Sequence, residues 1–210
     1  MTIPELVHSI EETTKSERVL ALASERGVLR PKDLAREGIQ AEYLRRVCDR
    51  GLIRKVGRGS YVLSERSSGP RLSLAVAARA VPNGVICLRS ALAFHGCGTS
   101  SADEVDVAIE RRAARPRLDY PRLHIARLGG AAFSGGIEVH SIESVAVRVF
   151  ALEKTLADLF KFRNKIGPHL AVDGLRAAFA AGRVDCEALR HYAALDRVER
   201  VMRPYVDALS

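Results

Sequence analysis

Long apolar runs are missing from this chain, and their absence excludes a membrane-spanning protein. No window reaches the roughly 18 uncharged apolar residues that a membrane span needs. The first residues, MTIPELVHSIEET, have neither the basic start nor the apolar stretch of a secretory signal. We therefore expect a soluble, cytoplasmic protein with no membrane partner.

Cysteine and proline are also scarce. The four cysteines, Cys48, Cys87, Cys97 and Cys186, lie far apart and form no C-x-x-C pair, so we expect reduced and mostly buried thiols. With 8 prolines and 47% hydrophobic residues in 210, the chain is neither disordered nor collagen-like, and it can bury a core. Its length suits a small domain followed by a medium one.

Acidic residues are fewer than basic ones, and the imbalance is localised. Lys and Arg number 33 against 25 Asp and Glu, which gives a net charge of +8. Residues 1–25 hold two basic and five acidic side chains, whereas residues 26–66 hold eleven basic and five acidic ones. The positive charge suggests a polyanionic partner, and its position directs attention to the N-terminal segment.

The N-terminal segment has the pattern of three short helices. The capping-box spacing from Thr14 to Glu17 predicts a helix start, because the hydroxyl and the carboxylate satisfy free N–H groups of the first turn. Proline at position 31 suits a first helical position, and glycines end each helix. The three predicted helices begin near Thr14, Pro31 and Gln40 and end at Gly27, Gly38 and Gly51.

After Gly51 the apolar residues alternate. Residues 52–56 and 60–63 predict two strands around Gly57-Arg58-Gly59, a hairpin with basic residues near its tip. Three helices and a basic hairpin are the elements of a winged helix-turn-helix, whose third helix enters the major groove while the hairpin meets the phosphate backbone. The alternative is a small helical domain with a solvated basic face.

Nine side chains are the candidates for contact with DNA. They are Arg30, Lys32, Tyr43, Arg45, Arg46, Arg50, Arg54, Lys55 and Arg58. We expect the arginines at 45–50 at or beside the major groove, the cations at 54–58 on phosphates, and those at 30–32 as an anchor for the preceding helix.

A polar stretch from Ser64 to Pro70 divides the chain into predicted domains at 1–66 and 67–210. Alternating apolar residues predict a sheet of four or more strands in the second domain, followed by helices from Leu152 to the end. The predicted strands cover residues 85–88, 104–109, 123–127, 136–140 and 145–150. We therefore expect an α+β fold, a winged helix-turn-helix followed by a mixed α/β domain with C-terminal helices.

Several segments together resemble the AbiEi-type antitoxins. The N-terminal segments are Leu29–Leu34, Gly38-Ile39, Tyr43-Leu44 and Gly51–Val62, and the later ones are Ser90–Gly96, Glu153–Asp158 and Lys161–Gly167. The resemblance spans nearly the whole chain and rests on the order and spacing of these segments. It implies the antitoxin of a type IV toxin-antitoxin or abortive-infection (phage-defence) pair. In that family the N-terminal domain binds double-stranded operator DNA and represses its own operon, while the C-terminal domain supports neutralisation of a nucleotidyltransferase toxin.

The second domain has no convincing catalytic pattern. No lysine follows an acidic residue by two positions, as a metal-dependent nuclease of the D...(D/E)-x-K type requires. Asp103 and Asp106 resemble part of a nucleotidyltransferase site, but on a strand they would face opposite sides. His95 and Cys97 have no second ligand pair at zinc spacing. We therefore expect a non-enzymatic protein with no catalytic residue, metal or cofactor.

Two basic stretches of the second domain are candidates for contact with a partner or with DNA. Residues 111–127 hold six arginines and one acidic residue, and form either a mobile basic arm or a solvated loop. The other is the helix near 154–165, where Asp158 is either part of the family signature or the helical-spacing partner of a lysine. The candidates are Arg111, Arg112, Arg115, Arg117, Lys154, Lys161, Arg163 and Lys165. The rival functions are a protein-binding module that grips a toxin and an orphan regulator without one.

Overall fold

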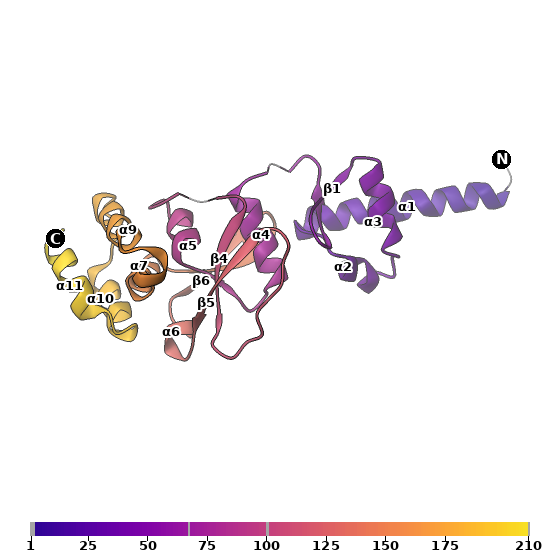
Figure 1. Ribbon diagram of the computed structural model, residues 1–210. Coiled ribbons are helices and arrows are strands. Elements are labelled where there is room, and N and C mark those ends of the chain that lie inside the picture. Colours follow the sequence, from indigo (N-terminus) through magenta and orange to yellow (C-terminus); the bar gives the residue numbers. More distant parts are fainter. Residues whose placement is uncertain (1–2, 67, 100, 210) are drawn as a thin grey trace.

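A computed structural model describes residues 3–66, 68–99 and 101–209, with the backbone alone for residues 3–13. Three groups of elements follow one another from the N-terminal to the C-terminal end of the molecule: helices with a hairpin, a mixed sheet with its helices, and a C-terminal helical group (Figure 1). Helix α1 extends beyond the rest of the first group (Figure 1).

The first group, here called the N-terminal unit, contains three helices and a hairpin in the predicted order. Its elements are α1 (Ile3–Arg26), α2 (Pro31–Arg36), α3 (Glu42–Asp49), β1 (Ile53–Gly57) and β2 (Ser60–Leu63). Strands β1 and β2 are antiparallel. Leu29 and Tyr61 exchange two backbone hydrogen bonds of 2.8 and 2.9 Å, which attach the segment between α1 and α2 to the hairpin.

The predicted start of the first helix is wrong. Helix α1 begins at Ile3, eleven residues before Thr14. Residues 5–26 contain neither glycine nor proline, and Pro4 lies in the first turn, where its missing N–H costs nothing. The capping-box pattern at Thr14 therefore lies inside a helix that nothing interrupts. The predicted end is confirmed, since Gly27 follows Arg26 with φ +69°.

The second group is built on a five-stranded mixed sheet, as the predicted α+β class requires. Its elements are α4 (Pro70–Ala80), β3 (Val85–Ile86), α5 (Leu88–Phe94), β4 (Glu104–Glu110), β5 (Arg122–Leu128), α6 (Ala131–Ser134), β6 (Ile137–Ile142) and β7 (Val145–Phe150). The strand order is β5-β4-β3-β7-β6. β5 runs parallel to β4 and β7 parallel to β3, whereas the β3–β4 and β6–β7 pairs are antiparallel.

Both faces of this sheet are covered. Side chains alternate along β4, so that Val105, Val107 and Ile109 pack in the cluster that includes α4, whereas Ala108 packs in the cluster formed with the other helices. That second cluster includes the apolar faces of α5 and of the C-terminal helices. Asp106, on the same face as Ala108, therefore points toward α5.

The C-terminal group is entirely helical. It consists of α7 (Leu152–Lys161), α8 (Arg163–Ile166), α9 (Pro168–Ala180), α10 (Cys186–Leu195) and α11 (Glu199–Asp207). The predicted break is confirmed at Gly167, with φ +92°, and Pro168, where α9 begins. Among the described residues, no helix combines the length and the apolar character needed to cross a membrane.

The N-terminal unit packs directly on the sheet. Val28, Val56 and Val62 share a buried cluster with α4 and the strands. The backbone of Gly27 lies so close to Glu143, in the β6–β7 turn, that a Cβ at this position would be 1.6 Å from the Glu143 carbonyl oxygen. Ser67, in the predicted linker, lies outside the described residues. The domain boundary at 66/67 thus stays a prediction, and buried contacts join the two sides of it.

Candidate nucleic-acid interface

Helices α2 and α3 leave one polar helical face open to solvent. Gly38, with φ +69°, forms the turn between them, and the buried Ile39 returns the chain to the core. α3 buries Leu44 and Val47 against α1 and the hairpin. Because a helix that buries one stripe exposes the opposite one, its charged residues face outward.

The exposed face of α3 carries both signs of charge. The Arg45 side chain is 84% exposed, and its Nε lies 3.8 Å from an Asp49 oxygen. Arg46 donates to Glu42 at 2.9 Å, again over one helical turn. Exposed pairs of this kind contribute little to stability, so the arginines can exchange these carboxylates for phosphate or base acceptors. Arg50, at the end of α3, is also exposed.

The expectation that Tyr43 contacts DNA is corrected. Tyr43 is buried in the core of the N-terminal unit. The guanidinium of Arg46 lies 5.3 Å from the centre of its ring, and the ammonium of Lys15 lies 5.9 Å from it. The ring therefore interacts with these two cations within the protein and is not itself exposed to DNA.

The hairpin presents two accessible cations. Lys55 and Arg58 are exposed, and Gly59 supplies the positive φ of +65° that the turn needs. Arg54 is half-buried and donates to the backbone oxygen of Arg66 at 2.9 Å. The hairpin thus offers Lys55 and Arg58 to a ligand, while Arg54 has a structural contact of its own.

Of the two candidates in the α2 region, one is exposed and the other has a contact within the protein. Lys32 is exposed. Arg30 donates to the backbone oxygen of Arg79 at 2.9 Å, so its side chain links the N-terminal unit to α4. Sequence reasoning missed the acid that follows Lys32, the fully buried Asp33, which accepts hydrogen bonds from Arg26, Arg79 and the Arg30 backbone. The sequence feature that could have identified Asp33 is its place at the third position of a helix that begins with proline, where a carboxylate can cap the helix.

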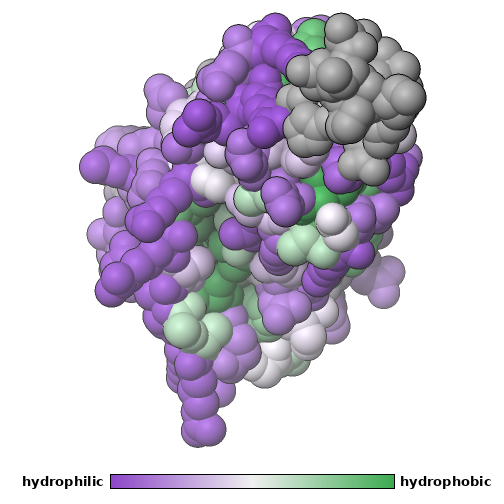
Figure 2. All heavy atoms as spheres, turned by 90° about the vertical axis from the view of Figure 1, so that its right-hand side faces the viewer, coloured by the Kyte–Doolittle hydropathy of each residue, from purple (hydrophilic) through white to green (hydrophobic). Residues whose placement is uncertain are grey.

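Hydrophilic residues cover most of the end of the molecule that carries α1, and hydrophobic ones show in a recess between them (Figure 2). Exposed cations on α2, α3 and the hairpin contribute to the polar surface of the N-terminal unit. They are Lys32, Arg36, Arg45, Arg50, Lys55 and Arg58. Arg36 was not predicted, although it lies one helical turn after Lys32.

The basic stretch after β4 forms a packed connecting loop. Arg111, Arg112, Arg115 and Arg117 are exposed. Several contacts hold the loop. Leu118 packs against the α4 side of the sheet, and the Arg127 guanidinium donates to backbone oxygens of residues 111 and 113 at 2.7 and 2.8 Å. Of the two predicted forms, the loop between strands matches this geometry.

The predicted surface role of Lys154 is also corrected. Its side chain is 0% exposed and its ammonium lies 2.6 Å from Asp158 and 2.9 Å from Asp196. Lys161 is 30% exposed and donates to Asp196 at 2.7 Å. A buried ammonium needs such partners, because leaving water without them is costly. Asp158 therefore pairs with Lys154 at helical spacing.

The remaining cations of that stretch lie at the surface of α8. Arg163 is half-buried and donates to the backbone oxygen of Phe160 at 2.7 Å, whereas Lys165 is exposed. Lys165 lies 5.8 Å from the centre of the Phe162 ring. Of the four candidates between 154 and 165, only Lys165 combines exposure with no hydrogen bond from its side chain in the described structure.

Of the two candidate acidic residues after α5, Asp106 has a structural partner. Both Asp106 oxygens accept hydrogen bonds of 2.9 Å from Arg89, and this contact raises the pKa of the Arg89 guanidinium. Asp106 is buried, while Asp103 is exposed. Among the described residues no group of three His, Cys, Asp or Glu side chains could hold a metal ion. Ser100, which belongs to the Gly-Thr-Ser stretch of the same nucleotidyltransferase-like pattern, lies outside the described residues.

The histidine and the cysteines near α5, which could have been metal ligands, belong to the core. His95 is buried and its Nε2 lies 2.7 Å from the Phe150 backbone oxygen. All four cysteines are free thiols, with Cys87 and Cys97 buried. Burial is also the main cause that raises the pKa of the Cys87 thiol well above its ordinary value, so this group stays protonated at neutral pH.

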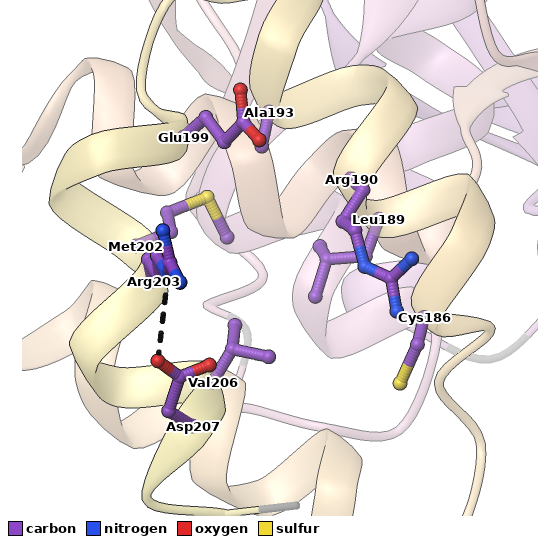
Figure 3. A pocket seen from close by; sticks show the side chains of 9 residues that line it. All are labelled: Cys186, Leu189, Arg190, Ala193, Glu199, Met202, Arg203, Val206 and Asp207. Atoms are coloured by element: carbon purple, nitrogen blue, oxygen red, sulfur yellow. Dashed lines mark ion pairs between the residues drawn. The ribbon is translucent and has the colours of Figure 1, made fainter.

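A separate hollow of about 290 Å³ lies between α10 and α11 (Figure 3). Leu189, Met202 and Val206 supply its apolar part, and the Arg203–Asp207 ion pair of 3.6 Å lies on the α11 side. Its lining holds no cluster of catalytic or metal-binding groups.

Comparison with known proteins finds a family similar to most of the N-terminal unit. Residues 17–64 match the protein family described as "Transcriptional regulator, AbiEi antitoxin". The crystal structure of the RV2827C protein from Mycobacterium tuberculosis has a similar fold, with a TM-score of 0.58 and 17% sequence identity, and the match covers 86% of this chain and 71% of that one. No curated protein matches the chain. The α+β fold is thus shared with a solved structure, and the antitoxin resemblance is supported for residues 17–64.

Proposed function

We propose that this protein is a non-enzymatic transcriptional regulator that binds double-stranded operator DNA through a winged helix-turn-helix formed by the N-terminal unit. The match of residues 17–64 to regulators of the AbiEi antitoxin class carries this proposal. The order of three helices and a hairpin supports it, as does the exposure of cations on both α3 and the hairpin. In this role α3 enters the major groove, while the hairpin cations neutralise phosphates.

The cations have separate tasks in this proposal. Arg45 and Arg46 lie on the helix that would reach base edges, and Arg50 follows its last residue; there an arginine can bind guanine through two hydrogen bonds. Lys55 and Arg58 would contact the backbone, together with Lys32 on α2. Arg30 and Arg54 act through the fold, because each donates to a backbone oxygen within the protein.

We also propose that the protein is the antitoxin of a type IV pair, represses its own operon and supports neutralisation of a nucleotidyltransferase toxin. The family resemblance carries this finer role. Expression with the product of the neighbouring gene tests it, since an antitoxin restores growth that the toxin alone arrests. An adjacent gene of unrelated type would favour an orphan regulator instead.

Titration of the full chain against the DNA fragment upstream of its gene tests operator binding. The double variant Lys55→Ala/Arg58→Ala should bind all sequences more weakly, and the slope of log K against log salt should fall by about two. The matched control, Arg200→Ala/Arg203→Ala, removes two exposed cations of α11 and should leave both quantities unchanged. Absence of a saturable complex at low salt would contradict the proposal.

A further inference from the structure

A basic hollow lies at the β5 edge of the sheet, where α8 approaches it. Its volume is about 530 Å³. Four cations from four separate places in the chain line it: Arg89 at the start of α5, Arg115 in the loop after β4, Arg127 on β5 and Lys165 on α8. His124 of β5 and Phe162, which lies between α7 and α8, also line the hollow.

The hollow has an excess of positive charge. Asp106 is the acidic residue in its lining, and both of its oxygens are bound by Arg89. The Nε2 of His124 lies 3.3 Å from an oxygen of Glu104, a residue that does not line the hollow. Arg115, Arg127 and Lys165 therefore have no acidic counterpart among the lining residues, and an anionic ligand would supply one.

Two of the cations are held in place before any ligand arrives. Arg89 is fixed by the buried Asp106, whose own N–H donates to the Ser90 hydroxyl at 2.9 Å. The NH1 nitrogen of Arg127 is fixed by two backbone oxygens of the connecting loop. A rigid cation loses little side-chain freedom on binding, so such groups favour a bound anion more than mobile surface lysines do.

The hollow also has an apolar part. Phe162, Ile166 and Leu88 contribute to it, and Lys165 lies near the Phe162 ring. Hollows of roughly 300–1,000 Å³ with apolar walls and a few fixed polar groups are typical of small-molecule sites. A ligand that joins negative phosphates to a flat apolar ring satisfies both parts of this lining.

We propose that this hollow binds the phosphates of a nucleotide, with the base against its apolar wall. The nucleotide is either a free nucleoside triphosphate or the end of a single nucleic-acid strand, because both present the same groups. The site is independent of operator binding by the N-terminal unit. None of its cations belongs to α2, α3 or the hairpin.

Fluorescence anisotropy of the full chain with labelled ATP and with a labelled ten-nucleotide oligothymidylate tests the site. The double variant Arg115→Ala/Lys165→Ala removes two exposed cations whose side chains make no hydrogen bond in the described structure. Its affinity should fall at least about tenfold, because each charge-assisted contact contributes more than a neutral one. The control Arg176→Ala/Arg203→Ala removes two exposed cations of α9 and α11 and should retain the parent affinity.

Binding of either probe that is lost in the first variant and kept in the control supports the proposal, and the probe that binds identifies the source. The proposal is overturned if neither probe saturates, if both double variants bind alike, or if tripolyphosphate competes as tightly as ATP. The same variants titrated with operator DNA separate this site from the proposed regulator function. Lys55→Ala/Arg58→Ala should weaken operator binding and leave probe binding intact.

Discussion

Arg79, in the last turn of α4, forms an ion pair with Asp33, at the third position of α2. The Arg79 Nε also donates to the backbone oxygen of Val28 at 3.2 Å. Asp33 in turn accepts from the Arg30 N–H at 2.9 Å, as in a capping box. One buried carboxylate therefore both begins a helix of the proposed DNA-reading pair and attaches that helix to the sheet.

Arg79→Ala should destabilise the protein by about 1–3 kcal/mol, because it leaves a fully buried carboxylate with one charged partner fewer. Urea unfolding measures the change. The matched control is Arg203→Ala, which breaks a pair whose side chains are 79% and 67% exposed and should cost less than about 0.5 kcal/mol. Equal losses of unfolding free energy in the two variants would show that the Arg79–Asp33 contact stabilises the protein no more than an exposed ion pair does.

Gly27→Ala should be far more costly than Gly38→Ala, although both residues have φ +69°. At Gly38 nothing lies within 4 Å of an added Cβ, so only the backbone strain of about 1 kcal/mol applies. At Gly27 the added carbon would meet the Glu143 carbonyl and force the N-terminal unit away from the sheet. Thermal unfolding of the two variants should differ clearly, and similar melting temperatures would contradict the close contact.

Local order was predictable from the sequence, because glycine, proline and apolar spacing act within a few residues. The helices that begin at Pro31 and Glu42, the hairpin and the break at Gly167 were all indicated in this way. Helices were predicted from Leu152 to the end of the chain, but no separate segment was marked for α11, which begins at Glu199 and contains Pro204. The early start of α1 was missed because a capping pattern does not stop a helix already formed.

The site was less predictable, because exposure depends on contacts far apart in the chain. Tyr43 and Lys154 are polar residues on charged helices, and both are buried by partners that the helical pattern does not reveal. Asp196, which binds Lys154, lies 42 residues later. The basic hollow likewise gathers residues from four separated segments, and no local spacing marks it.

Asp158 should make stability depend on pH. Burial raises the pKa of this carboxyl to about 8; Lys154 opposes the rise and Asp196 adds to it. The unfolded carboxyl titrates near 3.8, so between about pH 4 and 8 the native state holds a proton that the unfolded state has lost. Stability from this group is therefore complete below pH 4 and declines as pH rises toward 8, by at most about 1.4 kcal/mol per unit.

Asp158→Asn removes this titration while keeping the shape of the side chain. Its free energy of unfolding should match that of the parent near pH 4 and exceed it increasingly toward pH 8. Urea unfolding at several pH values measures the difference, and Asp173→Asn, at a carboxylate 69% exposed, provides the control curve. Parallel curves for Asp158→Asn and the parent would show that Asp158 is ionised throughout this range.

Arg45→Ala should change which operator sequences are preferred, whereas Lys55→Ala should weaken all of them alike. Arg45 lies on the outer face of α3, and its exposed contact with Asp49 is weak enough to be exchanged for a base edge. A lost contact to a base costs about 1–3 kcal/mol at one position of the site, while a lost phosphate contact lowers the salt slope by about one. Competition titrations with single-base variants of the operator distinguish the two patterns. If Arg45→Ala weakens every sequence equally, α3 contacts the backbone and base recognition must lie elsewhere in the N-terminal unit.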